Sequence, residues 1–276
     1  MRDFIMFFRA KEGSSAITWY LDQFLNINVI DYEPFDRYRF IDDENNSRGK
    51  DISSNDLLEC FNLIYNKKIK DSYIEQIRDI YIKYTDRFEI SFNKSNSVGF
   101  KFRRRNNIEQ DYLEILKNNN VVIWYLLRKD FIGRAFSLYH GDGTGNQGHL
   151  QFALANNKIT EDEIGDIEVN LIEYGKIVKK CYNQIKVSER KIRKYRDFGI
   201  DSYPLYYEDF MKNKFQFFRK ALENLEIEYN AEIIKNVINK APFYKKVHKK
   251  PLNKYIRNFK EVKVFLKNNF YDEIKE

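Results

Sequence analysis

The feature that most constrains the fold is an uninterrupted apolar run in the middle of the chain, from Val121 to Leu127. Such a run predicts a strand covered on both faces, because a strand with one wet face alternates apolar and polar residues. Strands of this kind belong to sheets that carry helices on both sides. The run ends at Arg128, and a helical pattern follows from Phe131 to His140.

Strand patterns alternate with helical patterns along the rest of the chain. Further strands are predicted near residues 4–8, 28–32, 98–102 and 203–207, and helices near residues 57–64, 74–81, 160–195, 209–225 and 230–240. Thr160 and Glu163 have the spacing of a capping box that opens the long helix. The alternation predicts an α/β fold with a P-loop-like parallel β-sheet flanked by helices and additional helical segments. We expect one domain over residues 1–276, with a basic coil and helix at about 241–276 as an appendage.

The N-terminal stretch from Asp3 to Ser15 carries the first functional signal. An apolar run is followed by Lys11, Gly13 and two serines, and a helical pattern begins directly afterwards. This order predicts a strand, a tight loop and a helix N-terminus, where unpaired backbone N–H groups and the helix dipole favour a phosphate or sulfate. It is not the G-x-x-x-x-G-K-[ST] loop, because the lysine precedes the only glycine. The alternative is a plain structural turn.

The second functional signal is the junction between the central strand and the next helix. A guanidinium at a strand end, here Arg128, can fork onto a phosphate. Ser137 lies nine residues on, and its hydroxyl would reach the same anion if the helix folds back beside the strand end; the alternatives are a solvated Arg128 and a serine that bonds its own helix. Parallel sheets place ligands beyond the carboxyl ends of their strands. The residues that directly follow predicted strands, and so are expected near one edge, are Lys11, Glu33, Arg103 to Arg105, Arg128 and Glu208.

The composition of the chain limits which ligands and partners can be expected. The formal charge of +7 favours anionic ligands, but Lys, Asn and Ile are abundant throughout, as an AT-rich genome would produce, so nucleic acid is not expected. Cys60 and Cys181 sit in apolar helical patterns and are expected to be buried free thiols, without a disulfide framework. The three histidines are dispersed, and no metal site is expected. No secretory or membrane-spanning run is apparent, so we expect a cytoplasmic protein, monomeric or homodimeric.

Together, the Lys-x-Gly-Ser-Ser loop and the Arg-x8-Ser junction resemble the sulfotransferases that use PAPS (3′-phosphoadenosine 5′-phosphosulfate). The interval between Arg128 and Ser137 is similar to that of the bacterial branch typified by trehalose 2-sulfotransferase. The strand at residues 98–102 resembles a "GxK" strand of that branch, and residues 207–210 resemble its "YEDL" strand end. The resemblance spans residues 3 to about 225 in the expected order.

The resemblance implies PAPS as co-substrate, PAP as product, and a hydroxyl of a carbohydrate-like small molecule or glycan as acceptor. Lys11 would contact the 5′-phosphate and the bridging oxygen. Apart from the resemblance, the place of Lys101 near the end of a predicted strand suggests that it assists charge stabilisation. Glu33 would be the general base, with His140 as the alternative base or a charge complement at its helix end. The remaining co-substrate contacts implied are Gly13, Ser14 and Ser15 around the phosphosulfate, and Arg128 and Ser137 on the 3′-phosphate.

The chain departs from the family pattern at Glu12, which stands where a small hydroxyl residue is usual. We expect this carboxylate to point outward or to pair, for instance with Arg9. The family's glycine-lysine loop near the C-terminus is not recognisable, and Lys245 to Lys250 replace it or form a solvated coil. Two other functions stay open: a P-loop-like phosphotransferase or kinase that uses Asp130 for a metal, and a non-catalytic module that binds polyanions.

Overall fold

The computed structural model describes seven stretches of the chain. They are residues 1–30, 52–66, 73–81, 96–103, 108–143, 166–240 and 251–270.

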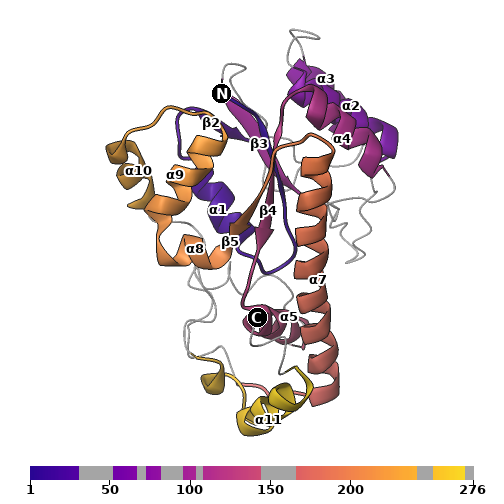
Figure 1. Ribbon diagram of the computed structural model, residues 1–276, viewed down its shortest axis with the longest axis vertical. Helices are drawn as coiled ribbons and strands as arrows, with labels where there is room; N and C mark the ends of the chain where they lie inside the picture. Colours follow the sequence, from indigo (N-terminus) through magenta and orange to yellow (C-terminus); the bar gives the residue numbers. More distant parts are fainter. Residues whose placement is uncertain are drawn as a thin grey trace, which may run out of the picture.

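A five-stranded parallel sheet forms the centre of the molecule, in the order β2-β3-β1-β4-β5 (Figure 1). Every residue of β1, β3 and β4 is buried, as the apolar runs require of strands covered on both faces. The prediction of an α/β fold with a parallel sheet is confirmed. The strand bounds are β1 Phe4–Phe7, β2 Ile27–Val29, β3 Ser97–Phe102, β4 Val122–Leu127 and β5 Ser202–Tyr206.

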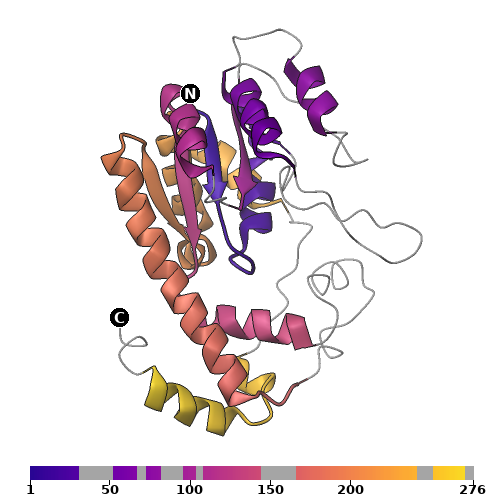
Figure 2. The same ribbon diagram turned by 90° about the vertical axis from the view of Figure 1, so that its right-hand side faces the viewer.

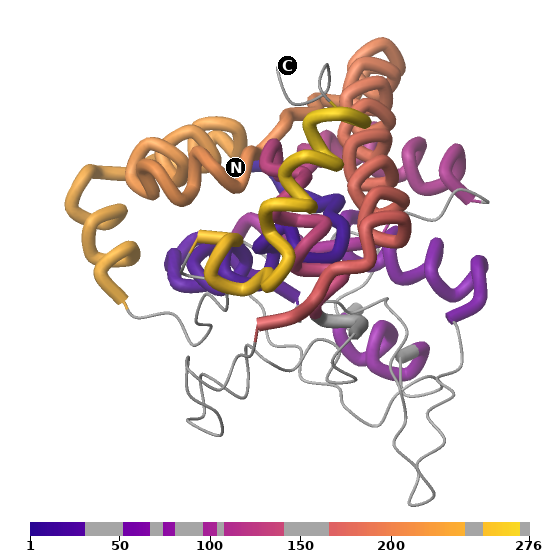
Figure 3. The backbone as a smooth tube through the Cα atoms, turned by 90° about the horizontal axis from the view of Figure 1, so that it is seen from below, coloured from indigo at the N-terminus to yellow at the C-terminus, as the bar shows by residue number. Residues whose placement is uncertain are grey.

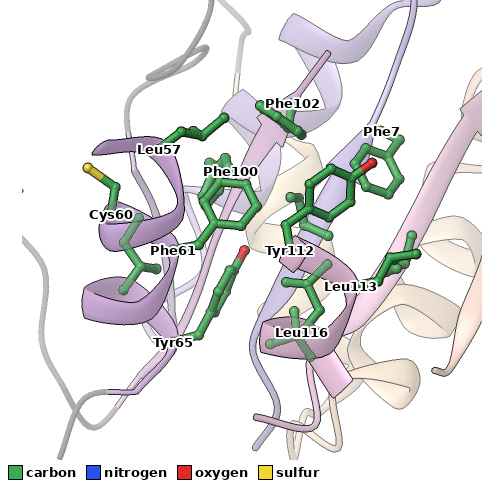
Figure 4. Close-up of a cluster of buried hydrophobic side chains, with 14 of the residues drawn as sticks. Phe7, Leu57, Cys60, Phe61, Tyr65, Phe100, Phe102, Tyr112, Leu113 and Leu116 are labelled. Atoms are coloured by element: carbon green, nitrogen blue, oxygen red, sulfur yellow. The ribbon is translucent and has the colours of Figure 1, made fainter. Parts of the chain in front are cut away.

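Helices cover both faces of the sheet (Figure 2). One face packs against α1, α8, α9 and α10, and the other against α2, α4 and the C-terminal half of α7. Figure 4 shows the second core, where Phe61 of α2 packs on Phe100 of β3 and Tyr112 of α4 packs on Phe61 and Phe102. The helix bounds are α1 Ser14–Leu21, α2 Ser54–Tyr65, α3 Tyr73–Tyr81, α4 Glu109–Asn118, α5 Phe131–Gly143, α7 Leu171–Asp197, α8 Tyr207–Lys212, α9 Lys214–Asn224, α10 Ala231–Ile238 and α11 Phe259–Asn269.

A third core lies below the carboxyl ends of the strands. The N-terminal half of α7 packs there against α5 and α11, and Figure 3 shows α11 running beside α7 as seen from below. The free thiol Cys181 of α7 is buried in this core, and Cys60 is buried in α2, as predicted. Within the described residues, none of the helices is both long and apolar enough to span a bilayer.

The long helix begins later than the sequence predicted. Asn170 caps α7 by accepting hydrogen bonds from the amides of Ile172 and Glu173, and Ile167 forms a β-bridge with Ile256 instead of a helical turn. An asparagine cap reinforced by this bridge fixes the start at Leu171. The expected capping box at residues 160–163 lies outside the described residues.

The helix predicted at 209–225 is divided into α8 and α9. Asn213 ends the first of these helices and caps the second, because its side chain accepts a hydrogen bond from the Gln216 amide. A capping residue inside an amphipathic stretch ends one helix and begins another, and the spacing of apolar residues alone does not reveal this break.

Candidate functional site

The loop between β1 and α1 has a backbone that only a few residue types tolerate. Lys11 has φ 64° and Gly13 has φ 80°, both in the left-handed region. An added Cβ at Gly13 would overlap the ring of Tyr207, so the glycine is required by space as well as by conformation. The N-cap residue of α1 is Gly13, and among the described residues there is no side-chain hydrogen bond to cap this helix, so the amides of its first turn are available to an anion.

Glu12 points into the protein beneath this loop and is 1% exposed. Its carboxylate accepts a hydrogen bond from the Arg9 amide at 2.8 Å and forms an ion pair with Arg134 Nη1 at 3.3 Å. Of the two alternatives that the sequence left open, pairing is the one observed, and the partners are the backbone of Arg9 and the guanidinium of Arg134.

Burial dominates the ionisation of Glu12. Desolvation raises the pKa of its carboxyl from 4.5 to about 7, although the charge of Arg134 opposes the rise. Arg134 itself is 2% exposed and fixed from three sides, because Nε donates to the Ala10 carbonyl at 3.1 Å and Nη2 donates to Gln184 Oε1 at 2.8 Å. Arg134 thereby ties the loop to α5 and α7, a role that the sequence analysis did not assign to it.

Arg128 reaches the same loop from the end of β4. Its Nη1 donates to the Lys11 carbonyl at 3.4 Å, its Nη2 donates to Asp130 Oδ2 at 2.9 Å, and the guanidinium lies 5.4 Å from the ring centre of Tyr207. The Nε of Arg128 is buried and meets no hydrogen-bond acceptor in the described chain. The two motifs are thus neighbours in space although the chain separates them widely.

Gly133 connects Arg128 with Ser137. The Gly133 amide donates to Asp130 Oδ1 at 2.7 Å, and its carbonyl accepts the Ser137 hydroxyl at 3.0 Å. An added Cβ at Gly133 would overlap Asp130 and lie 2.9 Å from Arg128 Nη2. The helix α5 therefore comes close to Arg128 at a residue that has no side chain. The Ser137 hydroxyl donates to its own helix, which is one of the alternatives that the sequence left open.

The stretch that follows β5 holds this junction in place. Glu208 accepts hydrogen bonds from the amides of Lys129 and Asp130, both at 3.1 Å. Tyr207 lies between Gly13 and Arg128. Glu208 follows a predicted strand and was expected near this edge, but no role was predicted for it. The Tyr-Glu-Asp order after the strand is the signal that marks it.

Lys101 enters from β3, on the other side of β1. It is 2% exposed, its Nζ donates to Ser15 Oγ at 2.9 Å, and it lies 5.1 Å from the ring centre of Phe8. Its ammonium therefore lies at the first turn of α1.

The two candidate bases are placed differently. Glu33 lies outside the described residues. His140 is 2% exposed, packs on Phe136 at 5.4 Å between ring centres, and borders a separate cavity near Arg257. Burial lowers the pKa of His140, which favours a neutral ring over a charge complement at the helix end.

A cleft of about 350 Å³ opens beside the loop, and we call it the loop cleft. Phe8, Arg9 and Ala10 form its loop side, Arg103 lies at the end of β3, and Lys180 and Gln184 reach it from α7. Within the described chain, no group of three or more His, Cys, Asp or Glu side chains is placed to hold a metal ion.

Comparison with known proteins gives structural likeness alone, because no protein-family model and no curated protein matches the sequence. The mouse sulfotransferase SULT7A1, solved as a complex with PAP, superposes with a TM-score of 0.50 at 10% identity, covering 100% of this chain and 85% of that one. A sulfotransferase from Alicyclobacillus acidocaldarius gives 0.46 at 14% identity, covering 100% and 93% of the two chains. The chain therefore shares the fold of the mouse sulfotransferase.

Proposed function

We propose that this protein is a sulfotransferase that moves a sulfuryl group from PAPS to a hydroxyl of a carbohydrate-like acceptor. The observation that carries the proposal is the contact between Arg128 and the Lys11 carbonyl, which joins two anion-binding motifs at one edge of the sheet. Each motif alone is compatible with a structural turn or a solvated arginine. Their meeting at the carboxyl ends of β1 and β4 gives one ligand two separate anion-binding regions.

The residues present fit an adenosine nucleotide that carries phosphate groups at the 3′ and 5′ positions of its ribose. The uncapped start of α1, Lys11 and Lys101 offer positive charge to the phosphosulfate, and Arg128 offers an Nε without an acceptor in the described chain. In the contacts implied by the family resemblance, Arg128 and Ser137 hold the 3′-phosphate. The Ser137 hydroxyl would then donate its hydrogen bond to a phosphate oxygen instead of to the Gly133 carbonyl.

The chemistry needs charge stabilisation at the leaving phosphate and a base at the acceptor. The bond between sulfur and the bridging oxygen breaks, its electron pair stays on the phosphate of PAP, and a new bond forms between sulfur and the acceptor oxygen. The acceptor proton passes to a base, for which we propose Glu33. Lys11 and Lys101 supply the positive charge that offsets the growing negative charge on the phosphate.

Binding of PAP tests the donor site directly. Saturating PAP should raise the melting temperature, and Lys11→Ala or Arg128→Ala should abolish most of that shift. Lys129→Ala is a matched control, because it removes a neighbouring cation that lies over the Tyr206 ring. An unchanged melting temperature with millimolar PAP would refute the proposal.

Turnover tests the proposed base separately from binding. Glu33→Gln should keep the PAP-induced shift and lose sulfuryl transfer by about 10²- to 10⁴-fold, the usual contribution of general-base catalysis. Full activity of this variant would remove Glu33 from the base role without affecting the donor site.

A kinase function has less support from the geometry. Asp130, the carboxylate expected to hold a metal in that alternative, already caps α5 through the Gly133 amide and pairs with Arg128. Magnesium-dependent turnover of ATP without any response to PAP would nevertheless reverse this preference.

A further inference from the structure

The carboxylate of Glu12 is deeply buried but is held by few contacts. The side chain is 1% exposed, yet within the described chain Oε2 accepts one hydrogen bond, from the Arg9 amide, and Oε1 accepts none. Arg134 Nη1 lies 3.3 Å from Oε1 but is not aligned to donate to it, since this buried nitrogen has no hydrogen-bond acceptor among the described residues. A buried carboxylate is costly unless it is paired and hydrogen-bonded. Oε1 can therefore take a proton without the loss of a hydrogen bond.

The ionisable groups that face Glu12 come from the loop, β4, α5 and α7. Arg134 approaches from α5, Arg128 from the end of β4 and Arg9 from the loop, and all three cations favour the charged carboxylate. Cys181 of α7 faces the same pair, but burial raises the pKa of its thiol, which is therefore neutral near pH 7. Desolvation outweighs the cations and brings the pKa of Glu12 to about 7. Glu12 is thus the group beneath the loop whose charge changes near neutral pH.

Two guanidiniums orient the loop backbone between Glu12 and the proposed donor. Arg134 Nε donates to the Ala10 carbonyl at 3.1 Å, and Arg128 Nη1 donates to the Lys11 carbonyl at 3.4 Å. In a trans peptide the N–H points opposite to the C=O, so the amides that follow these two carbonyls point away from the guanidiniums. The uncapped start of α1 follows directly. A donor bound there would be separated from the Glu12 carboxylate by the backbone of one short loop.

A donor on the loop would change the balance of charge beneath it. Without a ligand, the ion pair with Glu12 balances the charge of Arg134. The donor brings the negative charge of a phosphate to the same loop, where it attracts Arg134 and Arg128 and repels the Glu12 carboxylate. Salt screens buried charges only weakly, and a nearby anion favours the protonated form of a carboxyl group. The bound donor therefore favours a neutral Glu12.

We propose that Glu12 takes up a proton when the donor binds, so that the donor replaces this carboxylate as the counter-charge of Arg134. The proton comes from the solvent and adds to Oε1, and no other bond is formed or broken. The uptake makes the affinity for the donor, and for PAP, fall as the pH rises through and above neutrality. Release of PAP returns the proton to the solvent. The inference rests on the proposed sulfotransferase function for the identity of the ligand.

Calorimetric titration with PAP counts the protons. The binding heat is measured at about pH 7.5 in two buffers of different ionisation enthalpy, because the difference between the heats gives the number of protons taken from the buffer. The wild type should take up about half a proton more per PAP than Glu12→Gln, since only about a quarter of the Glu12 carboxyls are protonated at this pH before binding. The titration of PAP itself is common to both proteins and cancels in the comparison.

The affinity for PAP gives an independent count. Between about pH 6.5 and 8.5, the dissociation constant of the wild type should rise about fivefold or more relative to that of Glu12→Gln. Cys181→Ser is the control, because it removes the thiol that faces the same pair from α7 and should keep both the uptake and the slope. Glu12→Ser is a second variant without the carboxyl, in case Glu12→Gln does not fold. Melting temperatures without ligand show which variants fold.

The outcomes separate this inference from the proposed function. If PAP binds but the wild type and the Glu12 variants take up equal numbers of protons, the inference is overturned and the donor site stands. Loss of the uptake in Cys181→Ser would also overturn it, because the thiol would then be the group that titrates. If PAP does not bind, pyrophosphate replaces it as the probe of the loop. An uptake with pyrophosphate that Glu12→Gln abolishes supports the proton coupling while the sulfotransferase function fails, and its absence overturns both.

Discussion

The buried carboxyl of Glu12 makes the stability of this protein depend on pH in an unusual direction. Its pKa is raised from 4.5 to about 7 by desolvation, so the folded state binds a proton more tightly than the unfolded state does. The contribution of this group to stability is fully present below about pH 4.5 and is lost as the pH rises through about 7. Most paired carboxylates have the opposite effect, because their pKa is lowered on folding.

The size of the effect follows from the two pKa values. The full loss is about 3 kcal/mol, and about 2 kcal/mol of it falls between pH 5 and pH 7.5. Glu12→Gln removes the titration but keeps the shape of the protonated side chain. The free energy of unfolding of this variant, minus that of the wild type, should therefore rise by about 2 kcal/mol between these two pH values.

Urea unfolding without ligands at several pH values measures this difference, and all other titrating groups cancel in the subtraction. A flat difference for Glu12→Gln, or one that falls as pH rises, would show that Arg134 outweighs desolvation. The reasoning about this pair would then be refuted.

Three further changes probe the junction around the loop. Gly13→Ala should lower the melting temperature and weaken PAP binding, because its Cβ would overlap Tyr207 and its φ is positive; normal PAP affinity would contradict this. Glu208→Gln should destabilise the protein by about 1–3 kcal/mol in urea unfolding, since two amides lose a charged acceptor; an unchanged midpoint would contradict this. Arg128→Lys should weaken PAP binding about tenfold or more, because an ammonium cannot form the fork; equal affinities in a calorimetric titration would count against the fork.

The sequence predicted the sheet well because the signal is local. Residues 122–127 are all apolar and all buried, and a strand of this kind admits few alternatives. The alternation of strands and helices then implied a parallel sheet, and a parallel sheet places the ends of β1 and β4 at the same edge. The proximity of Lys11 and Arg128 follows from this topology rather than from any feature of the two residues themselves.

Features that depend on a distant partner were not predictable in the same way. The capping box at Thr160 suggested a start for the long helix, but Asn170 and the bridge between Ile167 and Ile256 set the start that the structure has. That bridge joins segments far apart in the sequence, and no local sequence pattern predicts it. The orientation of a single charged side chain is equally open until its partner is known, as Glu12 illustrates.

Glu12 also explains how an acidic residue can occupy a loop that attracts anions. Its charge is directed inward and opposed by Arg134, so the outer side of the loop keeps the field of Lys11 and of the α1 N-terminus. Arg134 also holds the Ala10 carbonyl and reaches Gln184 of α7, which borders the loop cleft. One buried pair thus fixes the loop backbone and links it to a wall of the loop cleft. A change at Glu12 should therefore disturb the loop backbone and, through it, the binding of PAP.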